Sequence, residues 1–165
     1  MSAKAEKEYY KPIKAKLEDL LRARVDNFHL EITANGFSRE LKDEVKEDIV
    51  WHFLQERKAR PDITGFVKGE YTLDFIVVEV KQSKMELDDI YQLRKYRDLF
   101  DAKFAFLASL QPIPGEIKRL HKVRYWLLAS PSHLQAVVLA HFDEDSTNFV
   151  EWYPENPFEK DLYWR

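Results

Sequence analysis

The segment that most constrains the fold of this chain is YTLDFIVVEVK, residues 71–81, near the middle of the sequence. Its aromatic and β-branched side chains favour an extended strand. Apolar side chains occupy both faces of that strand from Phe75 to Val78, which is typical of an inner strand covered from two sides. We therefore expect an α/β fold in which helices flank a central sheet.

The flanking sequence has patterns that suit such a sheet and its helices. Apolar residues at helical spacing alternate with short runs rich in β-branched and aromatic residues. In chain order these patterns predict helix 4–24, strand 28–33, helix 38–57, strands 62–67 and 71–81, helix 83–100, strand 104–108, helix 114–122, strand 125–128 and a hairpin of 136–142 with 149–153. The sequence shows neither a linker nor an internal repeat, so we expect one domain over residues 1–165.

Two charged residues end the apolar row of the long strand. Glu79 and Lys81 are two positions apart, so their side chains project from the same face as Phe75 and Val77. Charges beside a core are unfavourable unless they pair or bind a metal, and ligands of α/β sheets gather where strands end. Glu79 and Lys81 are therefore candidates for a functional site.

A second carboxylate, Asp62, begins the preceding predicted strand. A turn between the two strands would place them antiparallel and bring Asp62 close to Glu79. Two carboxylates and the main-chain carbonyl of Val80 offer the hard oxygen ligands that Mg²⁺ prefers. Lys81 would then lie beside a water on the metal, where it can orient that water, help to deprotonate it and stabilise charge on a phosphate.

These residues carry a resemblance to a known group of enzymes. Pro61-Asp62 followed by Glu79-Val80-Lys81 resembles the motif of the PD-(D/E)XK, or restriction-endonuclease-like, nuclease superfamily. Gln92 and Tyr96, four residues apart on the following helix, match the Gln-x-x-x-Tyr signature of its RecB-like and related archaeal members. The resemblance covers about residues 60–109. It implies an αβββαβ core with a mixed central sheet flanked by helices, to which this chain adds a C-terminal hairpin.

The resemblance implies a metal-dependent endonuclease that hydrolyses phosphodiester bonds in DNA. Asp62, Glu79 and the Val80 carbonyl would bind Mg²⁺ or Mn²⁺, and Lys81 would activate the attacking water. Gln92 would be a further catalytic residue that holds the lysine or the nucleic-acid backbone. Small members of the superfamily commonly act as homodimers, so the resemblance also implies a dimer.

Two further features follow from the same resemblance. Tyr96 would support the site from the helix that carries Gln92. Members often add an acidic metal ligand from the first helix, for which the candidates are Glu8 and Glu18, and Glu44 or Glu47 of the second predicted helix would serve as well. That second helix departs from the shortest pattern of the superfamily.

The amino-acid composition argues against several other kinds of active site. The chain has no cysteine, which excludes disulfides, thiolate metal sites and cysteine nucleophiles and fits a cytoplasmic location. No apolar stretch is long enough to cross a bilayer, so we expect no membrane partner. The sequence also lacks the His-Glu-x-x-His, Gly-x-Ser-x-Gly and Gly-x-Gly-x-x-Gly motifs.

The net charge of −3 means that binding of nucleic acid would need a local basic patch. Two clusters are candidates: Lys4, Lys7, Lys11, Lys14 and Lys16, and Lys118, Arg119, Lys122 and Arg124. Taken alone, each cluster is more typical of a solvated helix face. The alternative function is that of a catalytically inactive module, which keeps the fold and binds nucleic acid or a protein partner. If the chain is a nuclease, the sequence leaves RNA and branched DNA open as substrates.

Overall fold

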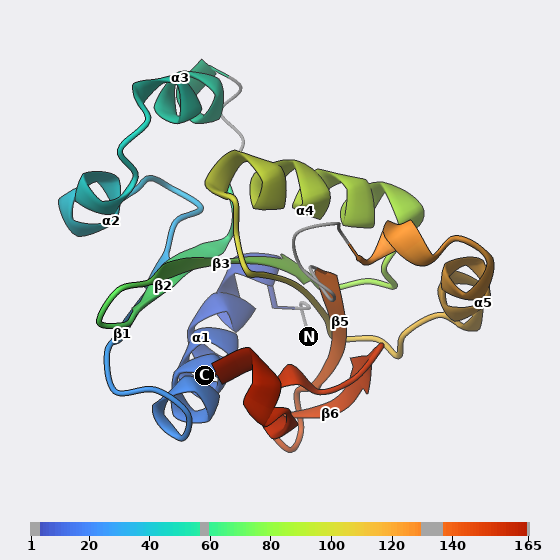
Figure 1. Cartoon of the computed structure of the whole chain (residues 1–165). Coiled ribbons are helices and arrows are strands. Elements are labelled where there is room, and N and C mark those ends of the chain that lie inside the picture. The colour runs from blue at the N-terminus through green and yellow to red at the C-terminus, as the bar shows by residue number, and fades with distance from the viewer. Residues whose placement is uncertain (1–3, 57–59, 130–136, 165) are drawn as a thin grey trace.

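The computed structural model describes residues 4–56, 60–129 and 137–164, which fold around a six-stranded mixed sheet (Figure 1). The strands are β1 (Phe28–Ile32), β2 (Ile63–Lys68), β3 (Leu73–Lys81), β4 (Phe104–Ser109), β5 (Val137–Asp143) and β6 (Asn148–Tyr153). They lie in chain order across the sheet. β1, β2 and β3 pair antiparallel, β3, β4 and β5 pair parallel, and β6 returns antiparallel to β5. The expected α/β class is confirmed.

β3 lies inside the sheet between β2 and β4, as its two apolar faces predict. Ile76, Val77 and Val78 are at most 2% exposed, because helices cover both faces of the strand. After β3, helix α4 (Leu87–Phe100) carries the chain to β4, which runs parallel to β3. A parallel neighbour requires such a crossover, so this part of the topology was predictable.

The sheet separates two hydrophobic cores. Helix α1 (Tyr10–Arg22) covers one face, and α4 covers the other (Figure 1). A 3₁₀ turn, η1 (Glu6–Tyr9), precedes α1, so the predicted helix over residues 4–24 is divided into two elements. The α1-side core contains Ile13, Leu17, Leu21, Ile76, Val78 and Phe106. The α4-side core contains Ile90, Leu93, Val77, Ala105 and Leu107.

The prediction of one helix over residues 38–57 is wrong, because the chain forms two short helices there. Ser38 caps α2 (Arg39–Glu44) as predicted, and its hydroxyl oxygen accepts the N–H of Leu41. Val45 then takes an extended conformation and is buried in the α4-side core, and α3 (Asp48–Glu56) follows. Burying Val45 requires the chain to bend, which a single straight helix would not allow.

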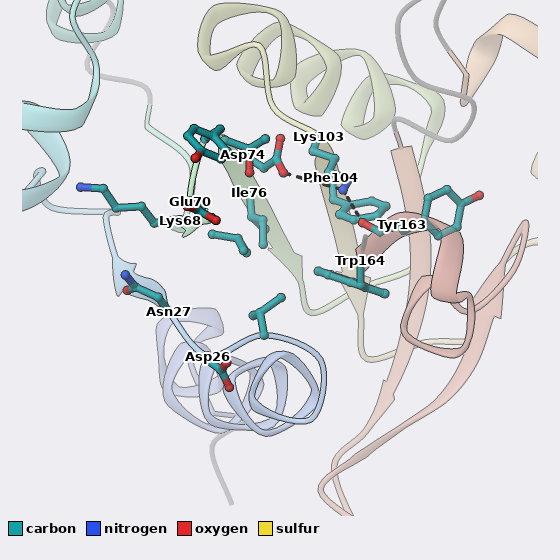
Figure 2. Close-up of a pocket in the computed structure, with 15 residues that line it drawn as sticks. Asp26, Asn27, Lys68, Glu70, Asp74, Ile76, Lys103, Phe104, Tyr163 and Trp164 are labelled. Carbon is teal, nitrogen blue, oxygen red and sulfur yellow. Dashed lines mark hydrogen bonds and ion pairs between the residues drawn. The ribbon is translucent and has the colours of Figure 1, made fainter.

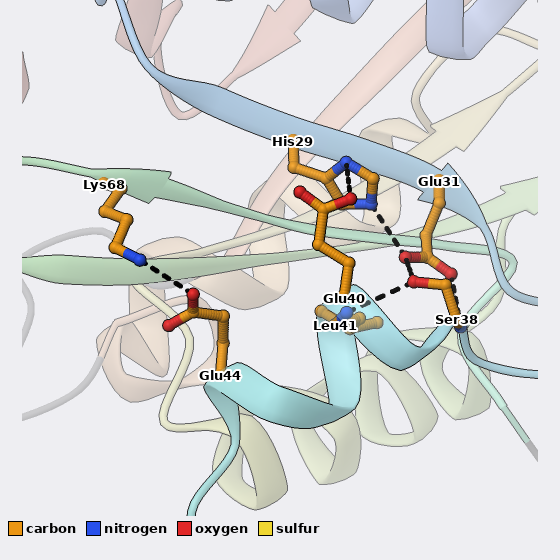
Figure 3. Close-up of polar contacts among 7 residues, drawn as sticks. All are labelled: His29, Glu31, Ser38, Glu40, Leu41, Glu44 and Lys68. Atoms are coloured by element: carbon orange, nitrogen blue, oxygen red, sulfur yellow. Dashed lines mark hydrogen bonds and ion pairs between the residues drawn. The ribbon is translucent and has the colours of Figure 1, made fainter.

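Polar contacts hold α2 against the first two strands (Figure 3). The backbone N–H of Ser38 donates to Oε2 of Glu31 on β1 at 2.8 Å, and the Ser38 hydroxyl donates to the other oxygen. His29 contacts the same carboxylate at 2.8 Å. Lys68, at the end of β2, pairs with Glu44 of α2 at 2.8 Å. The inserted helices are thus tied to the edge of the sheet.

Helix α4 begins later than its sequence pattern predicts. The expected capping box of Ser83 with Glu86 is replaced by a box of Glu86 with Asp89, in which the Glu86 N–H donates to Oδ2 of Asp89 at 2.7 Å. Ser83 instead uses its carbonyl to accept the hydroxyl of Ser109 at 2.8 Å. This contact ties residue 83 to the end of β4 and delays the helix by three residues.

The C-terminal third combines one correct prediction with one wrong one. The hairpin of β5 and β6 is confirmed. The strand predicted over residues 125–128 is instead a 3₁₀ turn, η2 (Tyr125–Leu127), which follows α5 (Gly115–Val123) and packs Leu127 into the α4-side core. Two more 3₁₀ turns, η3 (Pro157–Glu159) and η4 (Asp161–Trp164), cover the α1-side core. None of the helices in the described ranges is long and apolar enough to span a membrane.

Candidate functional site

Asp62 and Glu79 meet at the edge of the sheet where β2 begins and β3 ends. Ile63 pairs with Val78 in the antiparallel ladder, so Asp62 and Glu79, the next residues outward, lie opposite each other. The backbone N–H of Asp62 donates to Oε1 of Glu79 at 3.3 Å. The turn between the two strands therefore brings together two acids that are 17 residues apart in the sequence.

Asp62 is 8% exposed and is held from two directions. The N–H of Val80 donates to its Oδ2 at 2.8 Å, and the hydroxyl of Tyr10, at the start of α1, donates to its Oδ1 at 2.9 Å. Its main-chain carbonyl accepts the N–H of Thr33 at 2.8 Å. Because α1, β3 and the end of β1 all contact this residue, the position of the carboxylate is well defined.

Burial and mutual repulsion oppose ionisation of both acids. Desolvation, and after it the charge of Asp62, raises the pKa of Glu79 to about 9. Desolvation also raises the pKa of Asp62, while hydrogen bonds from Val80 and Tyr10 act in the opposite direction. Two carboxylates in one site titrate as a pair. At neutral pH this pair therefore retains a proton, and a bound cation would favour its release.

The main-chain carbonyl of Val80 faces the same edge. The carbonyl of its neighbour Lys81 accepts the N–H of Leu110 on the β4 side, and alternation along the strand turns the Val80 carbonyl toward β2. Continuing the register of Ile63 with Val78 outward places Pro61 opposite Val80. Proline has no N–H to donate to this carbonyl, so the Val80 carbonyl oxygen can coordinate a cation at this position.

Lys81 lies on the same face of β3 as Glu79 and forms an ion pair with α4. Its Nζ is 2.8 Å from Oδ2 and 3.0 Å from Oδ1 of Asp89. The hydrogen bond that Lys81 donates to Asp89 is the main cause that raises the pKa of Lys81 above its ordinary value. Asp89 therefore keeps the lysine protonated, and Lys81 lines the same small gap as Glu79.

Gln92 and Tyr96 extend from α4 toward the same face of the sheet. Nε2 of Gln92 lies 3.4 Å from the hydroxyl of Tyr96, which is 1% exposed. The charge of Glu79 contributes to raising the pKa of Tyr96, although desolvation is the main cause. Gln92, Lys81 and Asp89 line, with Glu79, a gap of about 20 Å³. That volume holds roughly one water molecule or one small cation.

An acid of the N-terminal region whose charge acts on both Asp62 and Glu79 is Glu6, which the sequence pattern did not predict. Oε2 of Glu6 accepts the N–H of Gln82 at 3.3 Å, and its charge raises the pKa of both Asp62 and Glu79. A usable signal was present, because Glu6 and Tyr10 are four residues apart and so share a face at the start of the helix. Tyr10 and Asp89 were also missed as contacts of the site.

The four acids that the sequence offered as a further metal ligand form other contacts or are exposed to solvent. Glu8 and Glu47 are exposed. Glu18 pairs with Lys14 at 3.0 Å, and Glu44 pairs with Lys68 at 2.8 Å. The charge of Glu6 instead raises the pKa of Asp62, and the charges of Asp62, Glu6 and Asp89 raise the pKa of Glu79.

The donor set fits a small hard cation. Within the described ranges, no group of three or more His, Asp or Glu side chains is placed to hold a metal ion. Mg²⁺ nevertheless uses one or two carboxylates and fills its remaining positions with water and phosphate oxygens. Asp62, Glu79 and the Val80 carbonyl supply oxygens of that kind at one point. Two adjacent acids that share a proton are also the arrangement that a divalent cation would stabilise.

Comparisons with known proteins do not assign a function, so any assignment depends on the geometry of this site. No protein-family model matches the chain, and neither a curated protein nor a solved structure matches it. The candidate site therefore rests on its own residues: the buried Asp62 and the partly buried Glu79, beside a main-chain carbonyl and a lysine that is held protonated.

Proposed function

We propose that this chain is a metal-dependent endonuclease that hydrolyses phosphodiester bonds in DNA. The observation that carries the proposal is the placement of Asp62 against Glu79 at the end of β3, with Lys81 on the same face. A structural role explains this cluster poorly, because a buried acid and a partly buried acid that repel each other destabilise a fold unless something is gained from them.

The order of elements supports the proposal. Helix α1, strands β1, β2 and β3, helix α4 and strand β4 follow one another in the αβββαβ order expected of a restriction-endonuclease-like core, with α2 and α3 inserted between β1 and β2. The residues that resemble the PD-(D/E)XK motif fall at the start of β2 and the end of β3. A fold alone does not establish an activity, so the chemistry must come from the site.

In this proposal, Asp62, Glu79 and the Val80 carbonyl hold Mg²⁺ or Mn²⁺. The ion, when bound, supplies Lewis-acid activation of water and neutralises phosphate charge. Lys81 is kept protonated by Asp89, which favours charge stabilisation and water orientation over proton removal as its role. Glu6 lies close enough for its charge to act on both acids, so it is our candidate for the acidic group from the first helical region.

Gln92 is proposed to contact the substrate backbone or Lys81 once the gap is occupied. Its side chain is exposed at the surface of α4 and lines the gap beside Glu79. Tyr96 lies beneath it and is almost completely buried. We therefore assign Gln92 a direct role and Tyr96 a positioning role.

The N-terminal lysines offer a path for the DNA backbone. The main-chain carbonyl of Lys4 accepts the side-chain amide of Gln82 at 2.8 Å, so the basic segment begins next to the residue that follows Lys81. Lys7 and Lys11 are exposed. Cations in this position can neutralise phosphates next to the site.

Cleavage assays with labelled DNA test the proposal. Single-stranded, double-stranded and branched DNA and a matched RNA are incubated with Mg²⁺ or Mn²⁺, with a chelator control. Wild type is compared with Asp62→Asn, Glu79→Gln and Lys81→Met, and with Glu159→Gln as a matched control on an exposed acid of η3. We expect metal-dependent cleavage that falls by about 10²-fold or more in the three site variants and is unchanged in the control. Cleavage that survives in the Glu79→Gln protein would disprove the assignment.

One observation favours the alternative, a catalytically inactive module that binds nucleic acid or a protein partner. Lys81 is already paired with Asp89, and the gap beside it is small. Salt-dependent DNA binding without cleavage would support this alternative. If the protein neither cleaves nor binds DNA, a protein partner is the remaining candidate.

A further inference from the structure

A large cavity lies far from the pair of acids. It has a volume of about 490 Å³ and opens at the other end of the sheet, where β2 ends and β3 and β4 begin (Figure 2). Asp74 and Ile76 line it from the α1 face of β3, whereas Glu79 and Lys81 lie on the α4 face. Six residues of strand, or roughly 20 Å, separate Asp74 from Val80. A ligand here would therefore not touch the proposed catalytic site.

One wall of the cavity is aromatic and held in place by its neighbours. Trp164 of η4 packs against Phe104 with ring centroids 5.4 Å apart, and its Nε1 donates to the carbonyl of Pro157 at 2.8 Å. Tyr163 packs edge-on against the same Phe104 ring at 5.5 Å. Fixed aromatic and aliphatic walls are what an apolar ligand body requires, and this volume is in the range of small-molecule sites.

The charges around the cavity are unequal. Three carboxylates line it, from Asp26, Glu70 and Asp74, against two lysines, Lys68 and Lys103. Both lysines are already paired: Lys68 with Glu44 at 2.8 Å, and Lys103 with Asp74 at 3.7 Å. Nζ of Lys103 also donates to the main-chain carbonyl of Tyr163.

Two of the carboxylates remain without partners in the described part of the chain. The side chains of Asp26 and Glu70 make neither an ion pair nor a hydrogen bond there. Figure 2 shows them on different sides of the same space, Asp26 beside the end of α1 and Glu70 near Lys68. Tyr71, next to Glu70 at the rim, is 91% exposed. Carboxylates together with an exposed aromatic ring are the groups that recognise an ammonium ion.

We propose that this cavity binds a small organic ammonium compound with an apolar body. The apolar part packs against Trp164, Phe104 and Ile76, and the ammonium group lies between Asp26 and Glu70 within reach of the Tyr71 ring. An anionic ligand is disfavoured because both lysines that could receive it are already paired with carboxylates. This site is independent of the proposed nuclease activity.

A pair of probes with the same ring and opposite charge tests the proposal. Phenethylammonium and phenylacetate are titrated into the full chain, without divalent metal, and followed by ¹H–¹⁵N correlation NMR. We expect phenethylammonium to bind in the millimolar range, as is usual for a fragment of this size, and to shift the Trp164 indole N–H and the Gly69 backbone N–H. Phenylacetate should bind at least about tenfold more weakly.

A double variant tests whether the two carboxylates recognise the ammonium group or apolar contacts alone hold the ligand. Asp26→Asn combined with Glu70→Gln keeps the shape of the cavity and should weaken phenethylammonium binding about fivefold or more. Asp145→Asn, an exposed acid on the β5–β6 turn, should leave binding unchanged. Equal binding of both probes, absence of shifts at Trp164 and Gly69 at millimolar phenethylammonium, or full binding by the double variant would each overturn the proposal.

Discussion

The hydroxyl of Tyr10 lies 2.9 Å from Oδ1 of Asp62, so the first helix fixes one of the two acids at the end of β3. The two residues are 52 positions apart in the sequence. This contact contributes to stability and opposes the effect of burial on the pKa of Asp62. It can be removed by a single substitution that keeps the ring.

Tyr10→Phe should lower the free energy of unfolding by about 1 kcal/mol, because it leaves a buried carboxylate with one donor fewer. Urea unfolding at neutral pH measures the loss. Tyr9→Phe is the matched control, since the Tyr9 hydroxyl makes a longer contact, 3.3 Å, with the exposed residue Glu144. If both variants lose the same stability, the contact with Asp62 has no special role.

Stability should fall as pH rises through the neutral range, because the folded pKa of Glu79 lies at about 9 and its ordinary value is 4.5. Between these values the folded state binds more protons than the unfolded state, so a rise in pH favours unfolding. Glu79→Gln removes this contribution. It should raise the melting temperature at about pH 8.5 more than at about pH 5.5. Thermal unfolding at both pH values checks this, and an equal effect at both would contradict the raised pKa.

Mg²⁺ should stabilise the wild-type protein and not the variants that lack one acid. At a concentration about ten times the dissociation constant, a ligand of the folded state adds about 1.4 kcal/mol, or roughly 4 °C in melting temperature for a chain of this size. Asp62→Asn and Glu79→Gln should lose this increment, and Glu159→Gln should keep it. Differential scanning calorimetry with and without Mg²⁺ provides the measurement, and an increment retained by both site variants would exclude this pair as the metal site.

Asp89→Asn should lower the pKa of Lys81, because the hydrogen bond that Lys81 donates to the Asp89 carboxylate is the largest cause of its elevation. The neutral amide can still accept the N–H of Glu86, so α4 should keep its cap. NMR titration of the Lys81 Cε resonance in protein with ¹³C-labelled lysine follows the change. Asp88→Asn, one residue earlier and exposed, is the control. A Lys81 titration that is the same in both variants would remove Asp89 from its proposed role.

The sequence by itself determined the central strand and its immediate neighbours. Residues 71–81 are apolar on both faces and could be stable only inside a covered sheet. The turn before them and the helix after them followed from local signals, so the antiparallel pair of β2 and β3 and the parallel pair of β3 and β4 were both predictable. The proximity of Asp62 and Glu79 follows from that register alone.

Tertiary structure decided the features that depend on contacts between distant segments. Helix 38–57 divides because Val45 is buried in the α4-side core, and α4 starts late because Ser83 contacts Ser109 of β4. The contacts of Tyr10, Glu6 and Asp89 at the site depend on how α1 and α4 pack across the sheet, which no local periodicity encodes. Side-chain packing between elements fixes these positions, so they appear only when the chain is folded.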